Sequence, residues 1–309
     1  MLIKQSAQRG YEKANEMVVP LDERLMPIRH ILHPTDFSQA SMAAFGHALR
    51  LGLNLKNDLT IMHVDPVRAD PDFENFPRVR ATLSRWDVLK EGATKDDLLT
   101  LGFGVRKILA MGDNPVASIL QLLWRKPADL MVLATHPEDP LVKWLPDMVG
   151  QSLARKSLTM SLFVPGHGHG FVSLETGAVR LRRILIPIDH RPHPQSAVDA
   201  ACTLAVGLGV QSVMFEVLYV GEQSSMPQLR LPKRDGWIWI ESIRTGVVVD
   251  EILETADLHQ SDLIVMATEW RHGFLDALLG STTERVLRRT ACPLLAVPVN
   301  NSTMTPPRP

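Results

Sequence analysis

Two short stretches, Arg29-His30-Ile31-Leu32-His33-Pro34-Thr35-Asp36 and Arg182-Arg183-Ile184-Leu185-Ile186-Pro187-Ile188-Asp189, are two copies of one pattern. Each copy is a short apolar run that ends at an aspartate, and a polar stretch and an alanine-rich helical pattern follow it. An apolar run of this length is typical of a buried strand. The sequence therefore indicates an internal duplication in which each copy begins with a strand that leads into a helix.

The repetition continues along both copies. The matching segments are the helical patterns 38–53 and 194–208, the strands 59–64 and 213–220, the helices 116–124 and 249–258, the strands 128–135 and 261–268, and the last strands 161–165 and 293–298. Strands that alternate with helices predict a parallel sheet covered on both faces. We expect two α/β domains in tandem, each with a five-stranded, mainly parallel sheet flanked by helices, its last strand reversed or at an edge.

The two copies differ in the middle. The first copy has room for an extra helix near residues 78–89. In the second copy, residues 221–239 are rich in Pro, Ser and Gly and predict an extended loop in place of that helix. Trp237 and Trp239 flank Ile238 in this segment, and they are either part of the core or an interaction surface.

Composition excludes several classes of protein. The 309 residues are enough for two domains, and 33 Lys+Arg against 34 Asp+Glu leave a formal net charge of −1. This balance argues against broad binding to nucleic acid or to an anionic membrane. Two cysteines cannot form a disulfide scaffold and favour a reducing cytoplasm. No apolar run reaches the ~20 residues of a membrane span, and residues 1–20 do not resemble a signal peptide.

Residues 280–297, Gly-Ser-Thr-Thr-Glu-Arg-Val-Leu-Arg-Arg-Thr-Ala-Cys-Pro-Leu-Leu-Ala-Val, look like the last helix and strand of a known family. Together with the duplicated Ile-Leu-x-Pro-x-Asp strand, they make the chain resemble the universal stress protein family in its tandem, two-domain form. The resemblance implies two Rossmann-like domains of the HUP type. The expected division is an arm at 1–28, a first domain at 29–166, a linker at 167–180, a second domain at 181–299 and a tail at 300–309.

The resemblance also implies a nucleotide site, because family members that bind nucleotides carry Gly-x2-Gly-x9-Gly-Ser/Thr. Glycines let a backbone approach phosphates, and a helix N-terminus favours an anion. In the second copy the motif positions are Ala267, Trp270, Gly280 and Ser281, so two of three glycines are replaced. In the first copy they are Ala134, Pro137, Asp147 and Met148, and we expect that site not to bind ATP. The implied binding residues are Ile188, Asp189, Val220, Ala267, Trp270, Gly280, Ser281 and Thr282.

Each of these residues also has a structural interpretation. Asp36 and Asp189 are typical of residues that cap the following helix. Ser281 and Glu284 have the spacing of a capping box, which needs no ligand. The ring of Trp270 could occupy the space of a phosphate, and in that case the loop would not bind nucleotide.

Other chemistry finds little support. The sequence has no Gly-x4-Gly-Lys-Ser/Thr loop and no Gly-x-Ser-x-Gly elbow, and we assign no catalytic residue. His167, His169, His190 and His193 could approach one another, but linker histidines are usually solvated and we assign no metal site. His33 and His63 are expected at the ends of adjacent strands as hydrogen-bonded core residues. Cys292 is expected to be a buried, small apolar residue.

The resemblance and the residues together predict a cytoplasmic stress-response protein without catalytic turnover that binds ATP or AMP in its C-terminal domain. A nucleotide-independent interaction module and a slow ATP-hydrolysing enzyme are the alternatives. The resemblance implies that the last strands, at Phe163-Val164 and Ala296-Val297, pair the two domains as an intramolecular pseudo-dimer. A homodimer or an unknown protein partner would then be possible in addition, whereas nucleic acid and membrane are excluded as partners.

Overall fold

The structure is a computed structural model that describes residues 25–66, 73–135, 157, 159–166, 170–269 and 282–299. The strands of the first half are β1 (His30–Pro34), β2 (Asp58–Asp65), β3 (Gly104–Met111), β4 (Leu130–Thr135) and β5 (Met160–Pro165). Those of the second half are β6 (Arg183–Ile188), β7 (Val213–Val220), β8 (Trp237–Arg244), β9 (Leu263–Thr268) and β10 (Leu294–Pro298). The expected alternation of strands and helices is confirmed in both halves.

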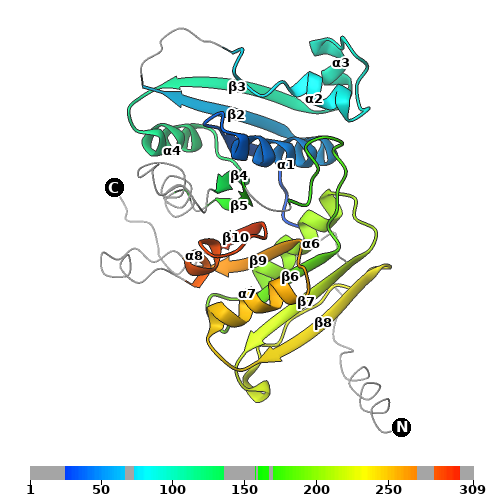
Figure 1. The fold of residues 1–309 in the computed structure, drawn as a ribbon, viewed down its shortest axis with the longest axis vertical. Helices are drawn as coiled ribbons and strands as arrows, with labels where there is room; N and C mark the ends of the chain where they lie inside the picture. The colour runs from blue at the N-terminus through cyan, green and yellow to red at the C-terminus, as the bar shows by residue number, and fades with distance from the viewer. Residues whose placement is uncertain are drawn as a thin grey trace, which may run out of the picture.

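All ten strands form one sheet in the order β3-β2-β1-β4-β5-β10-β9-β6-β7-β8, and Figure 1 shows them stacked along the long axis of the molecule. Within each half every neighbouring pair is parallel. The halves meet where β5 and β10 run antiparallel, with Leu295 opposite Leu162. The prediction of two five-stranded parallel sheets joined through their last strands is therefore confirmed.

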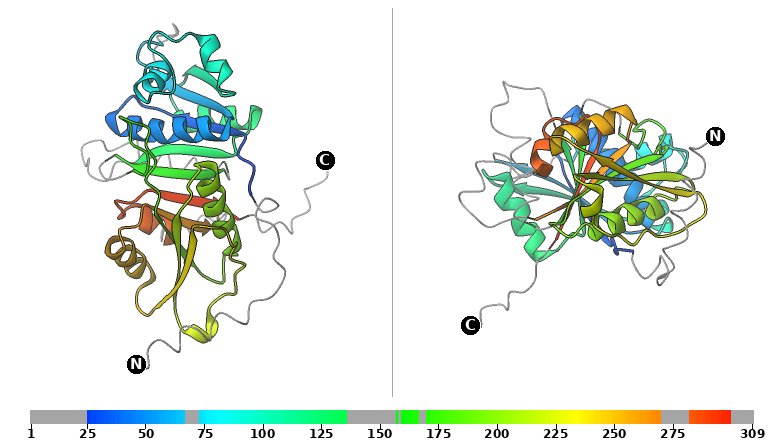
Figure 2. Two further views of the ribbon diagram at one scale, coloured as in Figure 1. Left: turned by 90° about the vertical axis from the view of Figure 1, so that its right-hand side faces the viewer. Right: turned by 90° about the horizontal axis from the view of Figure 1, so that it is seen from below.

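Helices cover both faces of this sheet. They are α1 (Gln39–Leu55), α2 (Val79–Arg85), α3 (Lys95–Thr100), α4 (Pro115–Arg125), α6 (Gln195–Gly207), α7 (Val248–Leu258) and α8 (Thr282–Leu287). The cores of the two faces are separate, with α1, α2, α3 and α6 over one and α4, α7 and α8 over the other. Figure 2 shows α6 and α7 on opposite sides of the strands of the second half.

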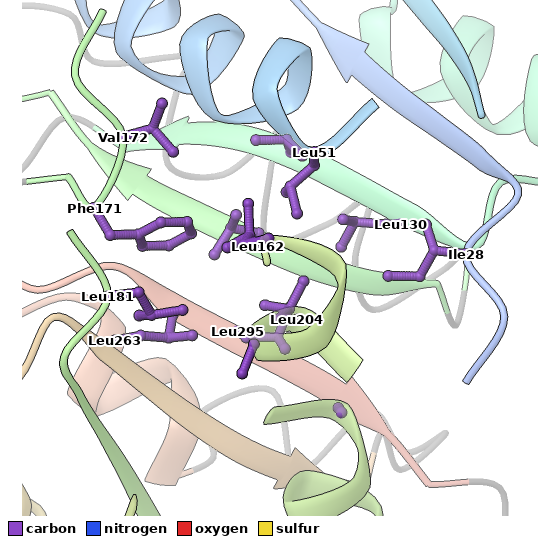
Figure 3. Close-up of a cluster of buried hydrophobic side chains, with 14 of the residues drawn as sticks. Ile28, Leu51, Leu130, Leu162, Phe171, Val172, Leu181, Leu204, Leu263 and Leu295 are labelled. Atoms are coloured by element: carbon purple, nitrogen blue, oxygen red, sulfur yellow. The ribbon is translucent and has the colours of Figure 1, made fainter. Parts of the chain in front are cut away.

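The first of these cores is continuous across the junction between the halves. Leu51 of α1 and Leu204 of α6 are both fully buried, and they lie near Leu162 and Leu295 of the joined strands (Figure 3). Phe171 also packs there, although it falls in the segment expected to be a linker. The two halves thus share one hydrophobic core as well as one sheet.

One expectation about the second half was wrong. Residues 237–244 form β8, a strand parallel to β7, so that Trp237 and Trp239 lie in a strand and not in a loop. The loop is residues 221–236, with one turn of 3-10 helix, η2 (Gln223–Ser225). It packs Met226, Leu229 and Leu231 on the core. The composition signal was real, but it ends at Gly236, where alternating Trp and Ile begin.

No helix among the described residues has both the length and the apolar character needed to cross a membrane.

Two histidines are buried where α1 packs on the sheet, His33 on β1 and His47 on α1 itself. His47 donates through Nδ1 to the carbonyl of Ala43 and accepts at Nε2 from the amide of Val172. His33 donates through Nδ1 to the carbonyl of Val132. Burial lowers the pKa of each ring to about 4, against an ordinary value of 6.5. Both rings are therefore neutral at pH 7, and protonating either of them would destabilise the folded state.

The free energy of unfolding should fall as the pH drops from about 6.5 to about 4, because the unfolded chain then binds protons that the folded chain excludes. A shift of this size corresponds to roughly 3 kcal/mol for each ring. Replacing His47 by Asn keeps a donor for Ala43 and should flatten the dependence, as measured by urea denaturation at several pH values. His193→Asn, at an exposed position, should leave it unchanged. Equal slopes for wild type and His47→Asn would contradict this account.

Leu295→Ala should destabilise the chain by about 2–5 kcal/mol, since it removes a fully buried side chain from the core shared by both halves. Chemical denaturation followed by circular dichroism measures the change. Leu258→Ala is the matched control, because Leu258 is 63% exposed and its truncation should cost little. If Leu295→Ala cost no more than Leu258→Ala, the junction would not be a structural centre.

Candidate functional site

In both halves the first strand and the fourth strand separate before they end. Pairing between β6 and β9 stops at Leu185 and Ile264, whereas β6 continues to pair with β7 as far as Ile188. The carbonyl of Arg183 accepts a hydrogen bond from the amide of Asp262 and therefore points toward β9. Backbone groups alternate in direction along a strand, so those of Pro187, four residues later, point toward β9 as well. Proline has no N–H to donate. The missing donor is therefore one reason why the two strands part at this point.

The same device operates in the first half. Pairing between β1 and β4 ends at Leu32 and Met131. The carbonyl of His30 accepts from the amide of Asp129, so the backbone groups of His30, and of Pro34 four residues later, point toward β4. The strand order places both separations where the chain reverses its direction of travel across the sheet. Open α/β sheets bind ligands at such switch points, outside the carboxyl ends of the strands.

The described site residues of the second half gather at this edge. Ile188 is buried and ends β6, and the exposed Asp189 follows it. Val220 ends the neighbouring strand β7 and is half-buried. Ala267 lies one residue before the end of β9 and packs on the core. The structure thus brings together four of the residues that the sequence singled out, from three adjacent strands.

The remaining site residues divide into two groups. Thr282 is the first residue of α8 and is half-buried. Trp270, Gly280 and Ser281 lie outside the described residues, and so do Pro137, Asp147 and Met148 of the first copy. The glycine motif, and the proposed capping box of Ser281 with Glu284, therefore stay predictions.

The two aspartates do not cap helices in the way the sequence suggested. Ser38 is the N-cap of α1 and accepts from the amide of Ser41, while Asp36 accepts from the amide of Ser38. Asp189 accepts from the amide of His190, five residues before α6 begins. Asp36 therefore organises the turn before the cap, and the capping interpretation of Asp189 was wrong.

The aromatic residues beside the two switch points differ between the halves. In the first half, the ring of Phe37 stacks on His63 with 4.0 Å between centroids and lies edge-on to Phe76. Phe37 adopts a φ of 65°, a left-handed conformation that costs about 1–2 kcal/mol for a residue other than glycine. In the second half the corresponding pair is the exposed His190 and Tyr219, with centroids 6.1 Å apart. The first edge thus holds a cluster of three stacked and edge-on rings, whereas at the second edge His190 is exposed and Tyr219 is buried.

The histidines set aside in the sequence analysis are placed as follows. His63 donates through Nδ1 to the carbonyl of Thr35, as expected of a hydrogen-bonded residue. His193 accepts from the amide of Gln195. Among the described residues no group of three or more His, Cys, Asp and Glu side chains is arranged to hold a metal ion. His167 and His169 lie outside those residues, so the four-histidine cluster is untested.

A buried polar group on β7 was missed. Glu216 is 6% exposed and accepts at 2.6 Å from Ser242 on one oxygen and from Nδ1 of His259 on the other. A carboxylate in this position satisfies both of its oxygens within the fold. The only signal in the sequence was a single glutamate inside an otherwise apolar strand.

Cys292 behaves as a structural residue. Its Sγ lies 3.0 Å from the carbonyl oxygen of Ser261. Burial, aided by the nearby charge of Asp262, raises the pKa of the thiol well above its ordinary value. The thiolate is the reactive form of cysteine, so this environment suppresses reactivity. Cys202 is 1% exposed.

The native protein should react slowly with Ellman's reagent at pH 8, whereas two thiols should react at once in guanidinium chloride. The raised pKa of Cys292 and the burial of Cys202 are the reasons. A Cys202→Ala variant should release a single thiol on unfolding and identifies the contribution of Cys292. One thiol reacting rapidly in the native wild type would show that Cys292 is accessible and ionisable.

Comparison with known proteins gives a consistent result. A family model described as the universal stress protein family matches residues 27–165 and 238–298. The chain is 33% identical over 96 residues to universal stress protein MJ0531 of Methanocaldococcus jannaschii, a match that covers 30% of this chain. It spans 56%, little more than half, of that relative's length.

Solved structures show the same fold over most of the chain. A universal stress protein from Archaeoglobus fulgidus has a TM-score of 0.57 at 18% identity, covering 88% of this chain and 98% of that one. A functionally unknown protein, PA1789, from Pseudomonas aeruginosa has a TM-score of 0.58 at 17% identity, covering 88% and 92%. At such identities the likeness shows the fold alone.

Proposed function

Because the chain belongs to the universal stress protein family, we propose that it is a cytoplasmic stress-response protein that acts by binding and not by catalytic turnover. Its ligand is an adenine nucleotide, ATP or AMP, and the second half carries the site. The first half has a structural or regulatory part.

One observation carries this proposal. In the second half, β6 and β9 separate beyond Leu185 and Ile264, and the exposed carboxylate of Asp189 follows the end of β6. A carboxylate in this position can accept hydrogen bonds from the hydroxyl groups of a ribose. Val220 and Ala267 offer small apolar surfaces on either side, which suit the base.

The contrast between the halves supports the choice of the second. Phe37, His63 and Phe76 pack against one another at the corresponding edge of the first half. A base would have to displace this stack and lose its contacts. In the second half, His190 is exposed and its ring meets Tyr219 only edge-on at 6.1 Å, so a base would have no stacked pair of rings to displace there.

Phosphate would lie near the start of α8. Thr282 is the first residue of that helix, and amides at a helix N-terminus attract an anion. Gly280 and Ser281 are proposed to complete this region on the strength of the sequence motif. They are the positions at which the second copy keeps the glycine motif, whereas Ala267 and Trp270 replace its first two glycines.

Calorimetric titration with ATP and with AMP, in the presence of magnesium, tests the proposal. Asp189→Ala should weaken binding about tenfold or more, because a hydrogen bond to a charged group contributes roughly 1.5–3 kcal/mol. Ser281→Asp should repel phosphate and abolish binding while it keeps an acceptor for the helix cap.

Asp36→Ala is the matched control. Asp36 is exposed, stands at the same position in the first half and also accepts one backbone amide, so its loss should affect folding similarly without affecting binding. Absence of saturable binding by the wild type would refute the proposal. Equal weakening by both alanine variants would instead show that the assignment to the second half is wrong.

A further inference from the structure

The strand β8 forms one end of the ten-stranded sheet of described residues (Figure 1). It is eight residues long and contains no proline. Edge strands expose unpaired backbone groups, and proteins usually protect them with charges, prolines or bulges. Trp237-Ile238-Trp239-Ile240 has none of these, and the two charged residues of β8, Glu241 and Arg244, lie in its second half, so the first half of this edge is open to pairing with another strand.

The hydrogen bonds of the sheet show which backbone groups of β8 are turned outward. The carbonyls of Gly236 and Arg244 accept from Val213 and Gly221 of the β7 side, so the even-numbered residues face β7. The odd-numbered residues Trp239, Glu241 and Ile243 therefore direct their N–H and C=O groups away from the sheet. The amide of Trp237 is already bonded to the carbonyl of Arg234.

One face of β8 is apolar and uncovered. Ile238 is 53% exposed and Ile240 is 38% exposed. They lie opposite Met214 and Glu216 on β7. Glu216 adds no free charge to this surface, since Ser242 and His259 occupy its two oxygens. The other face is packed: the ring of Trp239 stacks on Phe215 with 4.2 Å between centroids, and its Nε1 donates to the carbonyl of Pro232.

The first half offers an internal comparison. When the strands are aligned at Val64 and Val220, Asp58 and Gly104 stand where Met214 and Ile238 stand in the second half. Arg106 stands in place of Ile240, and Asp58 lies 3.6 Å from Lys126. The edge strand of the first half thus has a glycine in place of Ile238 and an arginine in place of Ile240.

We propose that β8 is a self-association surface, on which two copies of this chain pair antiparallel, edge to edge, with Ile240 opposite Ile240 of the second copy. In this register the outward groups of Trp239 bond to those of Glu241 of the second copy. Ile238 lies diagonally across from Ile240 of the second copy, within reach of an apolar contact. The sheets of the two copies then form one continuous sheet.

A second copy fits this edge for two reasons. The chain already joins its own halves in this way, through β5 and β10 around the Leu162–Leu295 pair. Charge favours the register as well: Glu241 would meet itself if the pairing shifted by one residue along each strand, and like charges opposite each other are unfavourable. Paired through Ile240, Glu241 lies opposite Trp239 of the second copy and is only diagonal to Glu241 and Trp237 of that copy, and Arg234 lies over the Trp237 ring.

Sedimentation velocity of the full chain at tens of micromolar tests this surface. The wild type should sediment as a dimer of the 34.4 kDa chain, and Ile240→Lys should sediment as a monomer because it places two ammonium groups together. Trp124→Lys is the control: Trp124 is 83% exposed on α4, far from β8 in the sheet order, and its loss should leave the dimer intact.

A cross-link fixes the register and does not depend on destabilising the interface. Ile240→Cys should form a disulfide-linked dimer on mild oxidation, because residues at a non-hydrogen-bonded pair have close side chains. Ile243→Cys, near the other end of β8, should not. A monomeric wild type, a dimer that survives Ile240→Lys, or equal cross-linking at both positions would overturn the proposal. Circular dichroism confirms that each variant is folded.

Discussion

Leu162 and Leu295 occupy the same place in the two copies of the repeat, three residues before the proline that ends the last strand, and they face each other across the β5–β10 ladder. This pairing fixes much of the remaining architecture. It relates the halves by an approximate two-fold axis through the sheet, so that α1 and α6 meet on one face and share a core. Because β5 and β10 pair with each other, neither is an edge strand, and β3 and β8 form the two ends of the sheet.

The antiparallel junction has a consequence for the two switch points. Each half is parallel within itself, so the carboxyl ends of its strands lie together, but the two sets of ends point to opposite edges of the common sheet. The two candidate sites therefore lie at opposite edges of the sheet and do not form one shared binding site. Among the described residues, the ring contacts at each edge are made within its own half: Phe37 with His63 in the first and His190 with Tyr219 in the second.

Much of the fold could be predicted from the sequence, because the spacing of apolar residues indicates which positions are buried. The alternation of strands and helices, the duplication and the pairing of the last strands were all predicted. β8 was missed since its neighbours in sequence, residues 221–236, are typical of a loop, and the tryptophans were judged with them. The direction of a backbone carbonyl cannot be read from residue types, so the role of Pro187 in parting β6 from β9 emerged only from the hydrogen bonds.

The candidate site was predictable to a smaller extent. Strand ends were enough to bring Ile188, Asp189, Val220 and Ala267 to one edge. Local chemistry was less certain: an aspartate after a strand was expected to cap the helix, yet a serine two residues beyond Asp36 does so, and Asp189 holds the amide of His190. Such bonds depend on loop conformations that differ between the copies despite the common pattern.

Duplication explains why such differences can persist. Packing at the junction needs both halves, because α1, α6 and the joined strands β5 and β10 share one core. A site or an edge needs only one copy. The first half has a left-handed Phe37 and places Arg106 in its edge strand, while the second half has an exposed His190 beside its switch point and exposed Ile238 and Ile240 on β8. The features that distinguish the halves therefore lie where the fold itself imposes least, at the carboxyl edges and at the two ends of the sheet.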